Sequence, residues 1–452
     1  MGEIDRSRIG ALMAREERRF VELHPRSEAL FERAQRSMLG GVPMPWMMEW
    51  AGPYPVFVEE AEGARFVDVD GHEYVDFCLG DTGAMTGHAP KAVAVAIAEQ
   101  ATKGITLMLP TEDAIWVGEE MARRFGLPYW QFCLTATDAN RFTIRLVREI
   151  TGRQKILVFN WCYHGSVDET IVTLVDGAVH PRRDSVGPPV EPSLTTRVVE
   201  WNDVAALERE LAHEDVACVL TEPALTNIGI VLPDPGFHEA LRDLTRRYGT
   251  YLVIDETHTI CAGPGGYTGA HGLEPDFVTI GKPLAIGVPA ACYGMSEEAA
   301  GRIQDRIDRM HVTDVGGVGG TLSGNALSLA AMRATLESVL TEEAFADMIA
   351  LAERWTDGVK SAIGRFELPW EVQRLGARAE YWFCPEPPRT GGEAAAADDH
   401  ELARLTHLYA LNRRILLTPF HNMALMCPAT TAEDVDLHTR VFAEAAEDLT
   451  AG

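Results

Sequence analysis

Lysine is scarce in this 452-residue chain. Only five lysines occur, Lys91, Lys103, Lys155, Lys282 and Lys360, and nearly all the other positive charge is arginine. Positive charge is also short as a whole: 40 Lys and Arg stand against 67 Asp and Glu, which gives a formal net charge of -27. A protein that binds a nucleic-acid backbone needs a basic face, so this balance disfavours a nucleic-acid partner.

Long apolar runs and paired cysteines are missing too. No uninterrupted apolar run reaches the roughly 18 residues of a membrane span, and the charged start "MGEIDRSRIG" lacks the apolar core of a secretory signal. The eight cysteines are scattered without a C-x-x-C pair, which indicates reduced thiols rather than a disulfide or zinc framework. We therefore expect a cytoplasmic protein with no membrane span and no metal site.

The pattern of the chain predicts three regions. Residues 1–75 read as an N-terminal helical arm and a small antiparallel meander, with a loop at "GGVPMPWMMEW" (40–50). In residues 76–325, strands alternate with helices, which implies a mainly parallel sheet in a large three-layer α/β/α domain. Residues 326–452 read as a small α+β domain, in which "PEPPRTGGEAAAADD" (385–399) predicts a disordered loop.

Polar side chains directly follow the predicted strands of the α/β region. In open parallel sheets, ligands bind beyond the carboxyl ends of the strands. The residues at these ends are Thr135, Thr137, Tyr163, His164, Glu222, Asn227, Asp255 and Lys282. Together they bring one lysine, acids, hydroxyl groups at a helix start and an aromatic ring to one rim.

This set suits one cofactor. Pyridoxal phosphate (PLP) needs a lysine that bonds to it, an acid beside its ring nitrogen and an anion site for its phosphate. The lysine has to lose its proton, which arginine cannot easily do. The stretch "DFVTIGKPLAIGVPAA", around Lys282, supplies such a lysine in an apolar, glycine-rich segment.

Nine motifs, in order, resemble those of the class III, fold-type I PLP aminotransferases, near glutamate-1-semialdehyde aminomutase and the amine and β-amino-acid transaminases. The resemblance runs from about residue 35 to the C-terminus. The motifs are "GGV" (40–42), "VDVDGHEYVDF" (67–77), "TGHAP" (86–90), "TATDANRFTIRLVREITGRQKI" (135–156), "CYHG" (162–165), "TEPALTNIG" (221–229), "IDET" (254–257), "TIGKPLAIGVPAA" (279–291) and "GGTLSGNALSLAA" (319–331).

The resemblance implies roles for the residues around the cofactor ring. Lys282 resembles the lysine that bonds to PLP and shuttles a proton, and Asp255 resembles the carboxylate paired with the ring nitrogen. Tyr163 is similar to the residue that stacks on one face of the ring. Thr257 stands where a residue packs the other face, and Asn227 matches an asparagine near the ring hydroxyl.

The resemblance also implies how the phosphate is held. Thr135, Ala136 and Thr137 match the phosphate turn, where backbone N–H groups at a helix start receive the phosphate. Relatives usually have glycine where this chain has Ala136, and alanine is tolerable if its φ stays negative. Thr321 resembles a threonine that reaches the phosphate from a second subunit, which implies a homodimer with shared active sites.

Departures from the family pattern bear on the substrate. The aminomutase follows "GGV" with a segment that supplies a carboxylate-binding arginine, whereas this chain has an apolar loop with Trp46, Met47 and Met48. An acidic residue of a Phe-Glu-Ala motif is also missing, and His421 and Asn422 stand there instead. These changes argue against glutamate-1-semialdehyde as the substrate.

The remaining candidates for a carboxylate ligand are chiefly Arg378 in "LGARAEYW" and Arg413 or Arg414 in "LNRRILL". Pro283, directly after Lys282, predicts a fixed turn that restricts how the lysine backbone moves. The expected activity is transamination between a hydrophobic or aromatic amine, or a β-amino acid, and a ketone, aldehyde or keto acid. Alternatives are a PLP-dependent 2,1-aminomutase, an amino-acid racemase or epimerase, and a catalytically silent binding protein of this fold.

Overall fold

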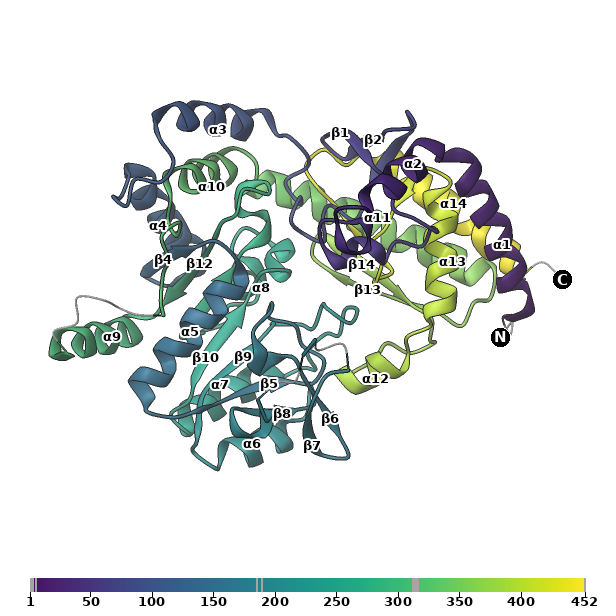
Figure 1. The fold of residues 1–452 in the computed structure, drawn as a ribbon. Helices are drawn as coiled ribbons and strands as arrows, with labels where there is room; N and C mark the ends of the chain where they lie inside the picture. Colours follow the sequence, from purple (N-terminus) through teal and green to yellow (C-terminus); the bar gives the residue numbers. More distant parts are fainter. Residues whose placement is uncertain (1–3, 5, 184–185, 188–189, 311–316, 451–452) are drawn as a thin grey trace. The chain divides into compact units, whose positions relative to one another are not determined.

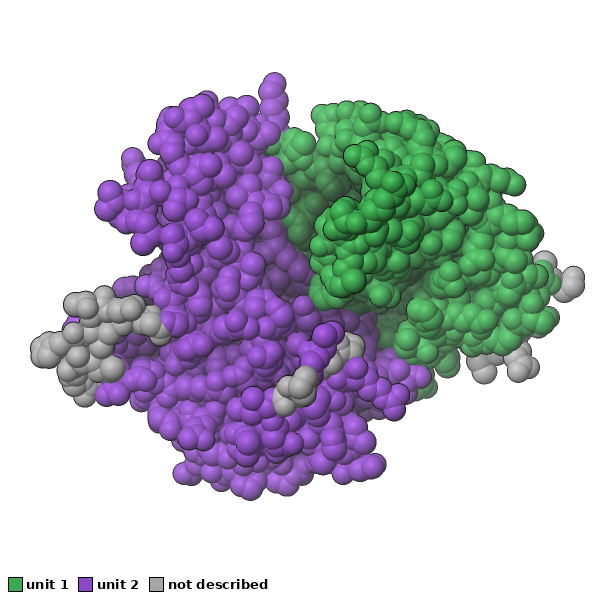
Figure 2. All heavy atoms as spheres, in the orientation of Figure 1, with its two compact units in different colours: residues 1–90, 346–387, 397–452 green, residues 91–345, 388–396 purple. Residues whose placement is uncertain are grey.

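The computed structural model describes residues 4, 6–183, 186–187, 190–310 and 317–450 (Figure 1). The chain forms two compact units, which Figure 2 colours separately. Unit 1 holds residues 1–90, 346–387 and 397–452, and unit 2 holds residues 91–345 and 388–396. No helix of the described ranges is both long and apolar enough to cross a membrane.

The boundaries between the units lie later in the chain than the predicted ones, at 75/76 and 325/326. Phe77 still belongs to unit 1, because its backbone oxygen accepts the N–H of Leu425 at 2.9 Å. After residue 325, helix α10 (Ala326–Ser338) packs on α3 (Lys91–Lys103) and α4 (Glu112–Phe125) of unit 2. Local sequence pattern predicts elements well but does not show which neighbour an element packs against.

A seven-stranded sheet is the centre of unit 2. Its strands, in spatial order, are β4 (Tyr129–Cys133), β12 (Ala291–Met295), β11 (Phe277–Ile280), β10 (Tyr251–Asp255), β9 (Val216–Thr221), β5 (Lys155–Phe159) and β8 (Thr196–Val199). Neighbours pair in parallel except at β12, which is antiparallel to both β11 and β4. The predicted mainly parallel sheet is therefore confirmed, and the antiparallel β12 was not predicted.

The sequence of the central strands explains their position. Every residue of β9, β10 and β11 is buried, as expected for parallel strands that are covered on both faces. Helix α5 (Ala136–Thr151) contacts β4 and β9 to β12 and crosses the sheet in Figure 1. Helices α6 (Val204–Leu211) and α7 (Phe237–Arg247) pack against β8 and β10, respectively.

The short α12 (Gly391–Ala396) corrects the prediction of a disordered loop at 385–399. The N–H of Gly392 donates to Glu200 Oε2 at 3.2 Å. At Gly391, an added Cβ would lie only 2.0 Å from the backbone oxygen of Asn160. Glycine was read as a mark of disorder here, but at Gly391 it allows a close approach of two backbones.

Unit 1 contains the predicted helical arm, formed by α1 (Arg6–Leu23) and α2 (Pro25–Ala34). The predicted meander is also confirmed: β1 (Val58–Glu62), β2 (Arg65–Asp68) and β3 (Glu73–Asp76) pair antiparallel, and β15 (Ile415–Leu416) adds in parallel to β3. A second sheet has the order β13 (Glu371–Leu375), β14 (Arg378–Trp382) and β16 (Met423–Leu425). The unit also holds α13 (His400–Leu411), α14 (Ala432–Thr450) and most of α11 (Glu342–Arg365).

Candidate active site

Asp255 and Lys282 lie at the carboxyl ends of two neighbouring parallel strands. Asp255 is the last residue of β10 and lies opposite Thr279 of β11 in the register of the pair. Lys282 follows the end of β11 at Ile280 after one glycine. The sheet therefore brings the predicted acid and the predicted lysine to one edge, as the strand-end reasoning required.

Asp255 is held by several donors. The carboxylate is almost fully buried; its Oδ2 accepts from Asn140 Nδ2 at 2.8 Å and lies 2.9 Å from His164 Nδ1. Its Oδ1 accepts the N–H of Thr257 at 3.0 Å. Burial alone would raise the pKa of Asp255, but the hydrogen bond and charge of His164, with those of the other donors, hold it below its ordinary value.

His164 is the positive partner of this carboxylate. Burial of the ring works against its charge, yet Cys162 and Asp255 raise the pKa of His164 to about 10. The ring is therefore protonated at neutral pH and forms an ion pair with Asp255. Reasoning from sequence noted His164 at the strand end but gave it no part in fixing the acid.

Asn140 completes the support of Asp255, and sequence reasoning missed it. It lies on α5, is fully buried, and donates from Nδ2 to the backbone oxygen of His164 at 3.1 Å as well as to Asp255. Its Oδ1 accepts from the hydroxyl of Thr279 at 2.6 Å. An asparagine inside an otherwise amphipathic helix was the available signal, because a buried amide requires polar partners.

Lys282 has an unusual backbone. Its φ is 48°, in the left-handed region that residues with a Cβ rarely adopt. It begins a 3-10 turn, Lys282–Ala285, in which Pro283 is the second residue, and Ile286 after the turn also has a positive φ of 49°. Proline fixes its own φ, and the residue before a proline usually takes an extended conformation, which Lys282 does not. A turn stands where it was predicted, and restricted movement of the lysine backbone stays a prediction.

The amine of Lys282 contacts a histidine that the sequence analysis did not select. Lys282 Nζ lies within hydrogen-bond distance of His258 Nε2, and His258 Nδ1 lies 3.0 Å from the hydroxyl oxygen of Thr226. The hydroxyl of Thr226 donates in turn to Glu222 Oε2, which also accepts the N–H of Thr226 at 3.1 Å. Predicted residues Glu222 and Lys282 are thus linked through two side chains that the prediction lacked.

The predicted phosphate turn lies at the start of α5. Thr135 is the N-cap: its hydroxyl oxygen accepts the N–H of Asp138 at 3.1 Å, and its hydroxyl donates to Asp138 Oδ2 at 2.9 Å. Ala136 is the first helical residue and has no positive φ, so alanine fits this position as predicted. The N–H groups of a first helical turn have no acceptor within the helix and can receive an anion.

Thr137 packs tightly against the loop that follows β5. Its Oγ1 accepts the N–H of Ser166 at 3.1 Å. An added Cβ on Gly165, which has a φ of +78°, would lie 2.1 Å from that oxygen. The "CYHG" motif and the phosphate turn therefore meet directly, and the glycine is required at the point of contact.

For the other predicted cofactor residues the structure gives a place in the fold. Tyr163 and Asn227 are half-buried after β5 and β9, and Thr257 is buried after β10. Thr321 is exposed before α10. Stacking by Tyr163, packing by Thr257, a contact of Asn227 with the ring hydroxyl and the reach of Thr321 into a second subunit stay predictions.

In unit 1, the predicted substrate loop forms a short 3-10 turn, Pro45–Met48. Trp46, Met47 and Met48 expose 44%, 39% and 41% of their surfaces, which is unusual for residues so apolar. The rings of Trp46 and Phe420 meet edge to face, with centroids 5.8 Å apart. This exposure is compatible with a surface that receives an apolar group.

The other predicted substrate residues of unit 1 gather around Glu380. Arg378 is fully buried and donates from Nη2 to Glu380 Oε2 at 3.4 Å, while His421 Nδ1 lies 3.3 Å from Glu380 Oε1. Burial works to raise the pKa of Glu380, but His421 and Arg378 lower it below the ordinary value. Asn422 is half-buried and accepts the N–H of Tyr381 at its backbone oxygen, at 3.3 Å. The buried pairing with Glu380 counts against Arg378 as a ligand for a substrate carboxylate.

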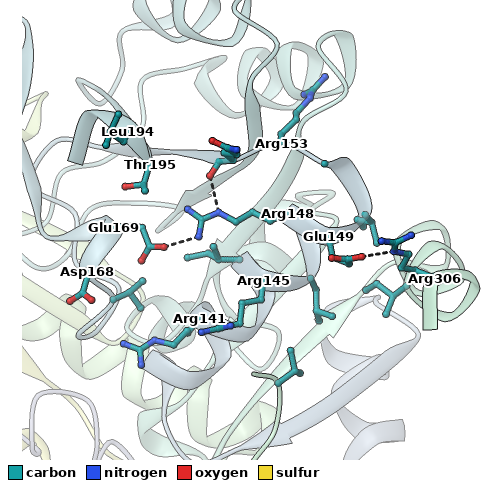
Figure 3. A pocket seen from close by; sticks show the side chains of 18 of the residues that line it. Arg141, Arg145, Arg148, Glu149, Arg153, Asp168, Glu169, Leu194, Thr195 and Arg306 are labelled. Atoms are coloured by element: carbon teal, nitrogen blue, oxygen red, sulfur yellow. Dashed lines mark hydrogen bonds and ion pairs between the residues drawn. The ribbon is translucent and has the colours of Figure 1, made fainter. Parts of the chain in front are cut away.

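A cavity of about 1050 Å³ lies elsewhere in unit 2, along another part of α5 (Figure 3). Arginines of α5 line it, including Arg148, whose Nη1 donates to Glu169 Oε1 at 2.7 Å. Glu149 pairs with Arg306 on another side. None of the predicted cofactor residues lines this cavity. The volume of a cavity is therefore not enough to identify the cofactor site in this protein.

The residues at the sheet edge fit PLP. An ionised Asp255 matches a protonated ring nitrogen, the start of α5 matches a phosphate, and the amine of Lys282 matches the aldehyde carbon of the cofactor.

Comparison with known proteins supports the same conclusion. The family model described as "Aminotransferase class-III" matches residues 46–381. A glutamate-1-semialdehyde 2,1-aminomutase of Sorangium cellulosum is 35% identical, over 94% of this chain and 97% of that protein. That of Neisseria meningitidis is 33% identical, over 93% and 98%.

Solved structures show the fold directly. The crystal structure of a glutamate-1-semialdehyde-aminomutase from Pseudomonas aeruginosa PAO1 has a TM-score of 0.97 and 54% identity, and covers 99% of both chains. A variant of that protein was solved in complex with PMP, the pyridoxamine form of the cofactor. An omega-transaminase from Sphaerobacter thermophilus has a TM-score of 0.84 and 27% identity, over 94% and 98%. This chain therefore belongs to the class III aminotransferases, with PLP fold type I and PLP as its cofactor.

Proposed function

We propose that this protein is a PLP-dependent 2,1-aminomutase, which moves an amino group between adjacent carbons of one substrate. The observation that carries the proposal is the similarity to the aminomutase of Pseudomonas aeruginosa PAO1, at 54% identity over 99% of both chains. The sequence analysis gave this activity as an alternative and favoured transamination. The relatives support the alternative better.

In this proposal, Asp255 and Lys282 divide the work. When bound, PLP supplies a ring that withdraws electrons from the substrate carbon that bears the amino group. Asp255, held ionised by His164 and Asn140, keeps a proton on the ring nitrogen. Lys282 would take a proton from the carbon that loses the amino group and supply a proton to the neighbouring carbon that gains it, and the amino group would be carried between the two by the bound cofactor. Substrate and product are then isomers and no oxidant is needed.

Phosphate binding fixes the position of the cofactor. The first N–H groups of α5, at Ala136 and Thr137, would receive the phosphate at the positive end of the helix dipole. Thr137 is held by the N–H of Ser166. A cofactor anchored at its phosphate and at its ring nitrogen has little freedom to tilt, which favours reaction at defined carbons.

Transamination is a second candidate, and one feature favours it. The exposed apolar loop of Trp46, Met47 and Met48 stands in place of the segment from which the aminomutase takes an arginine for a substrate carboxylate. The resemblance places this loop on the substrate side, so a hydrophobic amine is the substrate class for this candidate. As a homodimer, which the resemblance also implies, either enzyme would use Thr321 of a second subunit.

Product release distinguishes the two activities. An aminomutase keeps its substrate until the amino group has moved, whereas a transaminase releases a carbonyl product and leaves the cofactor as pyridoxamine phosphate. We would supply the purified PLP form with glutamate-1-semialdehyde alone, and separately with hydrophobic amines alone. Continuous formation of the 2,1-shifted isomer, without any added acceptor, supports the proposal.

A control variant and two contrary results complete this test. Lys282→Ala should form no isomer under the same conditions. Stoichiometric release of a carbonyl product from an amine, with accumulation of pyridoxamine phosphate and no isomer from the aminoaldehyde, would show transamination instead. Interconversion of two enantiomers, with no carbonyl product, would identify a racemase.

A further inference from the structure

A chain of hydrogen bonds leads from Glu222 to the amine of Lys282. We infer that His258 is the base that accepts the proton Lys282 must lose before its amine can bond to the cofactor. Glu222 and Thr226 set the ring of His258 for this task. The inference rests on the proposed role of Lys282 as the reacting amine.

The hydrogen bonds fix which nitrogen of His258 carries a proton. The hydroxyl of Thr226 donates its one hydrogen to Glu222 Oε2, because a carboxylate can only accept. The same hydroxyl oxygen lies 3.0 Å from His258 Nδ1 and must therefore accept from an Nδ1–H. In the neutral ring, Nε2 then carries the lone pair, and this is the nitrogen that contacts Lys282 Nζ.

Burial makes this arrangement effective. Thr226 is fully buried, and Glu222 and His258 expose only 4% and 7% of their surfaces. When an N–H bond of the Lys282 ammonium breaks, its electron pair stays on Nζ, and a new N–H bond forms at His258 Nε2. The positive charge moves to His258, where the Glu222 carboxylate stabilises it through Thr226.

Two other acids of this region, Asp255 and Glu256, form hydrogen bonds with residues other than His258. Asp255 is bound by Asn140 and His164. The carboxylate of Glu256, next to it in the chain, accepts the N–H groups of Tyr267 and Thr268 at 3.0 and 2.6 Å. Glu222 is therefore the carboxylate that the hydrogen bonds connect to His258, and the amine of Lys282 lies on the other side of the ring.

The test follows covalent attachment of the cofactor rather than turnover. PLP is added to the cofactor-free protein at a series of pH values, the bond is trapped with borohydride, and the labelled Lys282 peptide is measured by mass spectrometry. His258→Gln keeps an acceptor for the lysine but cannot take up its proton. We expect attachment at neutral pH to be about 100-fold slower, with the difference shrinking at high pH, where hydroxide can remove the proton directly.

Further variants separate a proton acceptor from a structural side chain. Thr226→Val removes the link to Glu222 and should slow attachment less than His258→Gln. Free imidazole should restore part of the rate to His258→Ala. His271→Gln, at the exposed end of α8 (Gly266–His271), is the matched control and should follow the wild-type profile.

Two outcomes overturn different claims. If the label lies on Lys282 but His258→Gln reproduces the wild-type pH profile, the role of His258 is wrong and the proposed role of Lys282 stands. If the wild-type protein is not labelled at Lys282, the proposed function itself fails. Circular dichroism of each cofactor-free variant checks that a slow rate is not a loss of fold.

Discussion

The support of Asp255 by Asn140 allows a quantitative prediction for unit 2. Asn140→Ala removes the bond to the ionised Asp255, worth about 1.5–3 kcal/mol, and two neutral bonds, to the His164 carbonyl and from the Thr279 hydroxyl, worth about 0.5–1.5 kcal/mol each. The partners stay buried, so water does not replace the lost bonds. We expect the free energy of unfolding to fall by about 2.5–6 kcal/mol.

Thr279→Val is the matched partial variant. It keeps the shape of the side chain and removes only the hydroxyl that donates to Asn140 at 2.6 Å, so we expect a loss of about 1–3 kcal/mol. Because the two side chains share one bond, the double variant should cost less than the sum of the single variants, by about 1–2 kcal/mol.

Urea unfolding of the cofactor-free proteins, followed by the fluorescence of buried tryptophans, measures these values where refolding is reversible. The cofactor-free form is used so that a change in PLP affinity does not enter the result. An Asn140→Ala loss no greater than that of Thr279→Val, or strict additivity in the double variant, would refute the idea that Asn140 anchors Asp255.

Three further predictions concern the turn, the acid and the substrate loop. Gly165→Ala should weaken PLP binding, because the new Cβ would lie 2.1 Å from Thr137 Oγ1. Titration of the cofactor-free protein with PLP measures the affinity. The control is Gly152→Ala, at a glycine that also has a positive φ but has open space around it, and this variant should leave the affinity unchanged. Burial opposes ionisation of Asp255, but its hydrogen-bonded partners lower its pKa below the ordinary 3.8. The ionised carboxylate therefore stabilises the fold above pH 3.8, and this stabilisation is lost as the pH falls through the lower pKa of the folded state. Asp255→Asn should make the free energy of unfolding depend less on pH in this acid range, and an unchanged dependence would contradict the assignment. Trp46→Ala should raise KM for a hydrophobic amine and not for a small polar one; equal effects on both would argue against an apolar substrate surface.

Much of the fold and of the PLP site could be predicted from the sequence. Runs of buried apolar residues marked β9, β10 and β11, and the polar residues after them included Asp255 and Lys282. Local pattern suffices there because the carboxyl ends of parallel strands share one edge of the sheet. The antiparallel β12 was missed, since strand direction depends on partners that are distant in the sequence.

The support of these residues could not be predicted in the same way. Asn140 and His258 do their work through contacts with residues more than twenty positions away, so their identity alone does not mark them. Arg378 was selected as a candidate ligand for a substrate carboxylate, and its ion pair with Glu380 could have been predicted from the sequence. Residues two apart on a strand point to the same face, and this pair meets on β14.

The antiparallel β12 has a consequence for the order in which parts of unit 2 fold during synthesis. β4, which leads directly into the phosphate turn, pairs only with β12 in the described sheet. During synthesis, β4 (residues 129–133) therefore has no strand to pair with until residues 291–295 have been made. Pairing across so long a stretch is slow and leaves a strand edge open to wrong partners. We expect nascent chains that end before residue 291 to need chaperone protection, and the phosphate turn to be fixed after the strands that carry Asp255 and Lys282.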